Sequence, residues 1–307
     1  MFFKDNRLSV LLTARDRLIL TQKTIESINK STTKFKNIDI YVFDNLSNPS
    51  EERMLIFSRL LKDEKIKYYS YDTPSSLTNC FAKAIAFNRW INMMKTSHEI
   101  RYLTGSETMN DYFILIDNDF ILGPGWDKYF LEAHKKLKDS EPNIHYLVKF
   151  PGGIPKIALN ESITNKYTFN VDNENFDVIA SCWGGGSGFW FFDFNQMLNL
   201  EWDYEDIIKT HGIYKKQDST TWFMIRRRKG ENINFVAGII PPKKDDPLVL
   251  HIGESLKCSM CNILTREGID AYKRNKHILT NKELELKNLS SKEIYDKFKY
   301  LESAKIW

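Results

Sequence analysis

The sequence predicts an α/β protein with a mostly parallel β-sheet flanked by helices. In the first 120 residues, short apolar runs rich in β-branched and aromatic side chains alternate with longer segments of helical spacing. This alternation is typical of strand–helix–strand units, whose strands are parallel. With 307 residues, of which 42% are hydrophobic, the chain is long and apolar enough to bury a core without disulfides.

The first half of the chain contains four predicted strands, each an apolar run of strand length. They are residues 8–14 (LSVLLTA), 38–45 (IDIYVFDN), 66–71 (IKYYSY) and 112–117 (YFILID). The segments between them predict three helices: one carrying Leu18, Ile25 and Ile28, one opened by Pro49 and two glutamates, and one from about Ser75 to Met94.

The second half is less regular. We expect a polar loop or small hairpin over the site at 151–177, and strands near 233–239 and 248–253. The charged tail is predicted to be helical, because Ser290 and Glu293 form a capping box. We therefore expect one catalytic domain over residues 1–257 and a helical C-terminal extension over residues 258–307.

Composition restricts the class of protein. Lys plus Arg number 44 against 40 Asp plus Glu, a net charge of +4 that permits an anionic ligand without requiring nucleic acid. Cysteine occurs four times, too few for a disulfide framework, and Cys258-x-x-Cys261 is interpreted as two ordinary thiols because no second such pair exists. No signal-peptide pattern and no apolar run of about 20 residues is present. We therefore expect a cytoplasmic protein without a transmembrane segment.

Carboxylates follow two of the predicted strands. Asp117 and Asp119 end the fourth strand and Asp44 ends the second, at the edge where open α/β sheets bind ligands. Two carboxylates one residue apart can converge on Mg²⁺ or Mn²⁺, ions that retain waters and accept phosphate oxygens. Taken alone, an Asp-x-Asp sequence is more typical of a turn than of a metal site.

Seven short motifs in a fixed order sharpen this hypothesis. They are TAR (13–15), DN (44–45), DND (117–119), GPGWD (123–127), WGGGSG (183–188), QD (217–218) and HIGES (251–255). Their order over residues 8–255 resembles that of the GT-A glycosyltransferases, nearest the large inverting family that includes cellulose and chitin synthases.

The resemblance implies a nucleotide site. Thr13, Ala14 and Arg15 would hold the base, Asp44 with Asn45 would read the uracil edge, and Asn88 would lie on a helix that contacts the donor. For Asp44, a role in capping the turn before the next helix is an equal alternative, since Asn45, Ser47 and Pro49 follow.

The resemblance also implies a metal site. Asp117 and Asn118 would contact the donor, with Asp117 shared between the ribose and the metal shell. Asp119 would bind the ion that bridges the diphosphate, and His251 would be a further ligand or a leaving-group contact. The expected cofactor is Mn²⁺ or Mg²⁺, which stabilises the charge on the departing nucleoside diphosphate. A single His at a strand end is otherwise most often structural.

The acceptor side is expected from two later motifs. Trp183, Gly184, Gly185 and Gly186 would lie beside the donor sugar and acceptor, with a buried core turn as the alternative. Asp218 would be the general base that deprotonates the acceptor hydroxyl. Gln217 stands where the family usually has Glu. The alternative for Asp218 is a first-turn residue on the helix dipole.

The predicted function is metal-dependent transfer, with inversion, of a sugar from a UDP-sugar to a hydroxyl acceptor. The acceptor is left open among a glycan, a lipid-linked sugar, a protein and a modified DNA base. Alternatives are a nucleotidyltransferase, against which the lack of a basic Gly-rich loop after the first strand argues, and a non-catalytic sugar- or nucleic-acid-binding module. We expect the C-terminal helix to pack on the domain or on a partner chain of an oligomer, with peripheral docking at a membrane as the alternative.

Overall fold

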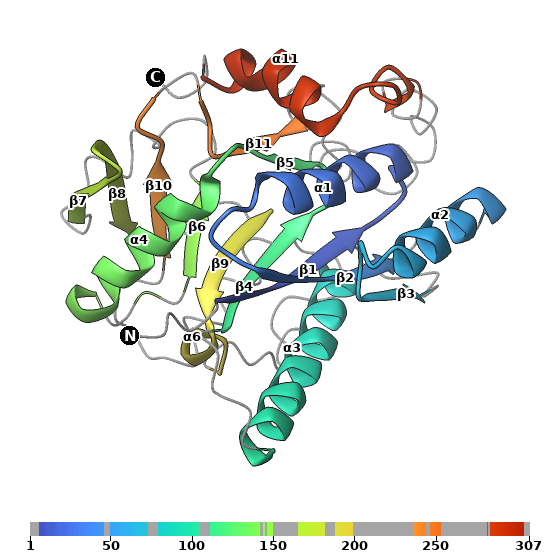
Figure 1. The fold of residues 1–307 in the computed structure, drawn as a ribbon, viewed down its shortest axis with the longest axis horizontal. Coiled ribbons are helices and arrows are strands. Elements are labelled where there is room, and N and C mark those ends of the chain that lie inside the picture. Colours follow the sequence, from blue (N-terminus) through green and yellow to red (C-terminus); the bar gives the residue numbers. More distant parts are fainter. Residues whose placement is uncertain are drawn as a thin grey trace.

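A computed structural model gives the fold (Figure 1). The residues that it describes are 6–45, 50–72, 79–104, 111–141, 144, 146–149, 165–181, 188–198, 236–243, 246–252, 281 and 283–303. Within them, a nine-stranded sheet carries helices on both faces. This arrangement confirms the predicted α/β class.

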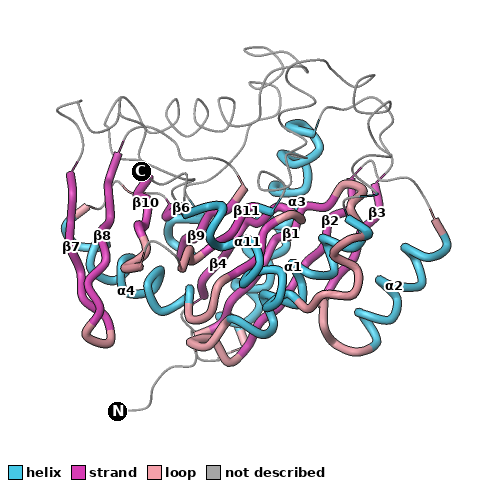
Figure 2. The backbone as a smooth tube through the Cα atoms, turned by 90° about the horizontal axis from the view of Figure 1, so that it is seen from above, coloured by secondary structure: helices cyan, strands magenta, loops and turns pink. Residues whose placement is uncertain are grey.

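The sheet has the strand order β3-β2-β1-β4-β9-β6-β10-β8-β7. Its strands are β1 (Arg7–Ala14), β2 (Asn37–Asn45), β3 (Tyr68–Asp72), β4 (Asp111–Asp117), β6 (Tyr146–Lys149), β7 (Asn165–Val171), β8 (Glu174–Ser181), β9 (Phe189–Asp193) and β10 (Val236–Ile240). The first four are mutually parallel, β6 pairs parallel with β10, and β9 runs antiparallel between β4 and β6. Figure 2 shows the row of strands from the side of β3 to the β7–β8 hairpin.

Alternating strand residues divide the core between the two faces of the sheet, as the period of two in a strand requires. Val10 and Leu12 face the cluster that contains α1, α2 and α4, whereas Leu11 faces the cluster that contains α3. The helices are α1 (Leu18–Ser31), α2 (Glu51–Lys62), α3 (Asn79–Leu103), α4 (Trp126–Ser140), the short α6 (Phe194–Leu198) and α11 (Ser291–Ser303).

The structure differs from two expectations, one about where a helix ends and one about where a hairpin lies. Helix α3 does not end near Met94 but runs on to Leu103, because neither Gly nor Pro occurs between Asn79 and Thr104 to stop it. The segment expected as a polar loop or small hairpin over the site does form a hairpin in its described part, β7–β8, but this hairpin lies at the edge of the sheet. Its turn is made by Asp172 and Asn173, both with positive φ, and β8 is paired to β10 on its other side.

A two-stranded sheet of β5 (Phe120–Leu122) and β11 (Val249–His251) joins the middle of the chain to its last third. Helix α11 packs on β5, β11 and α1, and its capping box is confirmed: Ser290 N–H donates to Glu293 (2.7 Å), and Glu293 N–H donates to Ser290 Oγ (3.2 Å). The C-terminal helix therefore packs on the main domain. The predicted boundary at residues 257/258 lies outside the described residues.

No helix in the described part of the chain is both long and apolar enough to cross a membrane.

Candidate active site

The parallel register brings the predicted residues of three strands to one level of the sheet. Thr13 on β1 lies opposite Asp117 on β4, and Ala14 lies opposite Asp44 on β2. All four positions are at the carboxyl ends of their strands, where the chain passes into loops. The edge that the sequence predicts as the site is therefore assembled by backbone pairing alone.

Asp117 is oriented by its neighbours on both sides. Thr13 Oγ1 donates to Asp117 Oδ1 at 2.7 Å, and the Asp117 N–H donates to the carbonyl of Gly188 at 2.9 Å. Gly188 cannot carry a side chain here, because a Cβ would lie 2.3 Å from the ring of Phe120. The one described glycine of the WGGGSG run therefore serves close packing behind Asp117.

Asn118 is buried, and its side-chain amide is directed into the protein. Its Nδ2 donates to Thr21 Oγ1 (3.0 Å) and to the carbonyl of Asp16 (3.4 Å). Asp16 and Arg17 form the turn between β1 and α1 with φ of 49° and 47°, a conformation that costs energy for residues with a Cβ. The structure thus gives Asn118 a supporting role at this turn, and its predicted contact with the donor stays a prediction.

Asp119 is the most enclosed member of the DND triplet. Its Oδ2 accepts a hydrogen bond from Arg17 Nη1, in a buried ion pair, and lies 3.2 Å from His251 Nε2. Burial alone would raise the pKa of Asp119, but the charges and hydrogen bonds of His251 and Arg17 outweigh it and hold the pKa far below its usual value. Asp119 is therefore a carboxylate held ionised inside the protein.

The position of His251 follows from β-pairing. In the β5–β11 sheet His251 is the partner of Phe120, and Ile252 N–H donates to the Asp119 carbonyl at 2.9 Å. The imidazole stacks on the Phe120 ring with centroids 4.4 Å apart and planes 4° from parallel. Two segments more than 100 residues apart in the sequence thus place a histidine against a carboxylate.

Asp44 is fully buried at the end of β2. Its Oδ2 accepts from Arg53 Nη1 at 2.6 Å and from the Tyr69 hydroxyl at 3.2 Å. Burial, and then the Asp44 charge, raise the pKa of Tyr69, so the hydroxyl stays a donor. The N-cap of α2 is Ser50, whose Oγ accepts from Arg53 N–H. Asp44 therefore reaches the first turn of α2 through an arginine side chain.

For the remaining predicted residues that it describes, the structure gives mainly burial and position in an element. Arg15 is half-buried in the turn after β1, the backbone of Asn45 pairs opposite Asp72, and Asn88 is half-buried within α3. Six predicted residues lie outside the described part of the chain: Trp183, Gly184, Gly185, Gly186, Gln217 and Asp218.

The predicted metal ligands fit an ion only in part. Asp119 Oδ2 and His251 Nε2 are 3.2 Å apart, close to the separation of about 3.0 Å between two ligands at right angles on an octahedral ion such as Mg²⁺. No group of three or more His, Cys, Asp or Glu side chains converges on one point among the described residues. The structure therefore does not bring the predicted set of Asp117, Asp119 and His251 together as three ligands of one ion, and only the Asp119–His251 pair is close.

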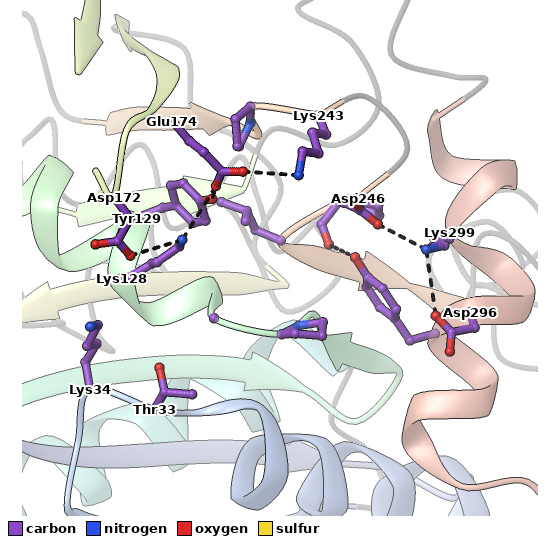
Figure 3. Close-up of a pocket in the computed structure, with 16 residues that line it drawn as sticks. Thr33, Lys34, Lys128, Tyr129, Asp172, Glu174, Lys243, Asp246, Asp296 and Lys299 are labelled. Atoms are coloured by element: carbon purple, nitrogen blue, oxygen red, sulfur yellow. Dashed lines mark hydrogen bonds and ion pairs between the residues drawn. The ribbon is translucent and has the colours of Figure 1, made fainter. Parts of the chain in front are cut away.

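A cavity of about 510 Å³ lies away from these residues, between α4, the β7–β8 turn and α11 (Figure 3). Lys128 and Lys243 bind Glu174 there, and Lys299 binds Asp246. Hydrogen bonds, first from Tyr129 and then from Lys243, lower the pKa of Glu174 to about 2. No predicted site residue lines this cavity. The ion pairs around it connect the elements that surround it.

Comparison with known proteins gives a likeness of fold. No family model and no curated protein matches the chain. Among solved structures it is similar to S. aureus TarS 1-349 in complex with UDP-GlcNAc, with 11% identity and a TM-score of 0.41 over 76% of this chain and 55% of that one. It is also similar to GalNAc-T7 with UDP, GalNAc and Mn²⁺, with 11% identity and a TM-score of 0.47 over 78% of this chain and 46% of that one.

A glycosyltransferase involved in the glycosylation of the major capsid of PBCV-1 matches with 12% identity and a TM-score of 0.37, over 89% of this chain and 99% of that one. The chain spans about half the length of the TarS and GalNAc-T7 chains. All three are GT-A glycosyltransferases, and the likeness to them concerns the fold alone. With TM-scores below 0.5, we base no functional inference on this likeness.

Sequence reasoning missed the cations of the site. Arg17 and Arg53 each neutralise one of the predicted carboxylates, and Phe120 orients His251. The only available signal for Arg17 was its place in the turn after β1, two residues beyond the predicted Arg15. For Arg53, helical spacing gives no indication that the side chain turns back toward β2.

Proposed function

We propose that this chain is a metal-dependent glycosyltransferase that moves a sugar from a nucleotide-sugar donor, with UDP as the expected nucleotide, to a hydroxyl acceptor with inversion. The observation that supports this most is the place of Asp117, level with Thr13 and Asp44 at the carboxyl ends of the parallel strands. Two residues further on, Asp119 lies 3.2 Å from His251. Open α/β sheets bind ligands at this edge.

The proposal assigns roles to the predicted site residues that the structure describes. Asp119 and His251 would hold Mn²⁺ or Mg²⁺, which when bound stabilises the negative charge of the departing nucleoside diphosphate. Asp117, oriented by the Thr13 hydroxyl, would contact the ribose and the water shell of the ion. The turn of Ala14 and Arg15 would hold the base.

Asp44 is proposed to read the uracil edge, as the motif order implies. Its Oδ2 accepts from Arg53 and Tyr69, which fix the orientation of the carboxylate. A preset acceptor at the end of β2 suits an N–H donor on a planar base. Asn45 and Asn88 would complete this donor side of the site.

The reacting side of the site rests on residues outside the described part of the chain. Asp218 would take the proton of the acceptor hydroxyl as that oxygen attacks the anomeric carbon from the face opposite the diphosphate. Gln217, Trp183 and Gly184–Gly186 would position the acceptor and the donor sugar. The acceptor class and the choice between hexosyl and pentosyl transfer stay open.

The test measures release of nucleoside diphosphate from a panel of nucleotide sugars, with Mn²⁺ and with EDTA. We expect release from one donor that needs the ion, and its loss in Asp119→Ala. Asp39→Ala is the matched control, because Asp39 lies on the same sheet but at its other edge, paired with Arg7. If no donor reacts and calorimetry detects no binding of UDP with Mn²⁺, the proposal is wrong. Binding of UDP without release would leave two alternatives, an enzyme that strictly requires its acceptor and a non-catalytic binding module.

A further inference from the structure

We propose that Arg17 is a positioning residue that holds the Asp119 carboxylate while no divalent cation is bound, and that the cation competes with Arg17 for this carboxylate. The inference rests on the proposed function, because it takes Asp119 and His251 as the metal ligands. It adds a residue that neither the motif order nor the comparisons assign.

The competition follows from the geometry of a single oxygen. Arg17 Nη1 and His251 Nε2 both meet Asp119 at Oδ2, the atom whose separation from the imidazole suits a shared ion. The Arg17 and Asp119 side chains are 4% and 7% exposed, so little solvent screens the charges of this pair. A cation placed between Asp119 and His251 would face the guanidinium at close range, and like charges repel strongly where solvent is excluded.

The backbone indicates that Arg17 is held in this position by the fold. Asp16 and Arg17 both have positive φ, and such positions persist only where the surroundings determine them. The carbonyl of Arg17 accepts from Thr21 N–H (2.9 Å) and from Thr21 Oγ1 (2.8 Å), while Asn118 donates to the carbonyl of Asp16 (3.4 Å). The turn is thus fastened both to α1 and to the residue that precedes Asp119.

Asp119 is then neutralised by a different cation in the metal-free and in the metal-bound site. Without a metal, Arg17 neutralises a buried carboxylate that would otherwise be costly to keep charged. With a metal, the same guanidinium has to give up Asp119 Oδ2. Removal of Arg17 should therefore act in opposite directions, destabilising the metal-free protein and strengthening binding of the ion. If the ion pair were purely structural, removal of Arg17 would lower both the stability of the metal-free protein and its affinity for the ion, because Asp119 would be displaced.

The experiment measures Mn²⁺ alone, with no donor and no turnover. Binding is followed by the electron paramagnetic resonance signal of free Mn²⁺, and thermal unfolding is followed with EDTA and with Mn²⁺. Arg17→Met is compared with wild type, with Arg17→Lys, and with Arg7→Met, which removes a part-exposed ion pair at the other edge of the sheet.

We expect Arg17→Met to unfold at a lower temperature in EDTA and to bind Mn²⁺ about 5-fold more tightly or better, the low end of coupling between two competing ligands. Its Mn²⁺-induced rise in unfolding temperature should exceed that of wild type. Arg17→Lys, which keeps the charge, should gain less affinity, and Arg7→Met should bind Mn²⁺ as wild type does. If Arg17→Met does not fold, Arg17→Gln takes its place.

The outcomes separate the inference from the proposed function. If wild type binds Mn²⁺ and the Arg17 variants bind it equally or less tightly, the competition is wrong and the metal site stands. If wild type binds none but Arg17→Met does, the competition is supported in its strongest form. If neither wild type nor any variant binds Mn²⁺, the metal site and the inference fail together.

Discussion

Charged side chains gather at two places in the described structure, and these places differ mainly in burial. At the carboxyl ends of the strands the carboxylates are few and enclosed, with Asp44 at 0% and Asp119 at 5% exposure. Around the cavity of Figure 3 the charges are more numerous and more exposed, from 19% of the side chain at Lys299 to 61% at Asp172 and 66% at Lys243.

The comparison teaches that the number of ion pairs does not identify a site. Exposed pairs form at little cost and contribute little, since water solvates both partners. Buried pairs cost several kcal/mol per ion to desolvate, and removal of one partner leaves the other uncompensated. Buried charges at the ligand-binding edge of an α/β sheet are therefore the stronger indication of function. Four predictions test this difference, from the largest expected effect to the smallest.

The largest effect is expected at the Asp44–Arg53 pair. Arg53→Met leaves the fully buried Asp44 without its cation, so the free energy of unfolding should fall by about 3–5 kcal/mol. Urea denaturation measures this loss. In the double variant Asp44→Asn/Arg53→Met no charge is left unpaired, and we expect it to be more stable than Arg53→Met alone. A double variant that loses the sum of both single losses would contradict this account.

The next effect is steric. Gly188→Ala places a Cβ within 2.3 Å of the Phe120 ring, and overpacking of this kind typically costs about 1–3 kcal/mol. Because Phe120 stacks on His251, Mn²⁺ binding should weaken as well. Gly125→Ala is the control: it strains a position with φ of +66°, but its Cβ would meet only Lys128 carbons at 3.8 and 3.9 Å, which are ordinary contacts. Stability should therefore fall while Mn²⁺ binding is unchanged. Unaltered Mn²⁺ binding in Gly188→Ala would show that Phe120 does not position the imidazole.

A third prediction concerns Glu283, a buried acid that accepts from Leu20 N–H at the start of α1. Burial raises its pKa, and the hydrogen bonds from the helix offset only part of this rise. The folded protein thus keeps this proton to higher pH than the unfolded chain, whose glutamate has a pKa of about 4.3. The stability from Glu283 is fully present below the unfolded pKa and is lost as pH rises through the folded pKa.

Glu283→Gln stays neutral and keeps an acceptor oxygen for Leu20. We expect it to flatten the fall in unfolding free energy above the unfolded pKa, measured by urea denaturation from acidic to neutral pH. Glu285→Gln is the matched control, because Glu285 is exposed two residues away. An equal slope in wild type and Glu283→Gln would mean that Glu283 ionises alike in both states.

The sequence predicted the parallel strands and the shared level of their polar ends, because both depend on local patterns. Apolar runs define β1, β2 and β4, and their polar ends then meet wherever the strands pair in parallel. It could not predict that Arg17 reaches Asp119 or that Phe120 orients His251, since these contacts depend on tertiary packing across more than 100 residues. The β7–β8 hairpin was misplaced for the same reason: pairing with β10 decides its position.

The smallest effect is expected at the exposed pairs of the cavity. Lys243→Ala removes an ion pair with Glu174, but Lys128 and the Tyr129 hydroxyl still bind that carboxylate. Because exposed pairs contribute little, the midpoint of thermal unfolding should shift by about 1 °C or less. Release of nucleoside diphosphate should match wild type, since Lys243 lies outside the proposed site. A shift as large as that of Arg53→Met would mean that burial does not separate the two regions.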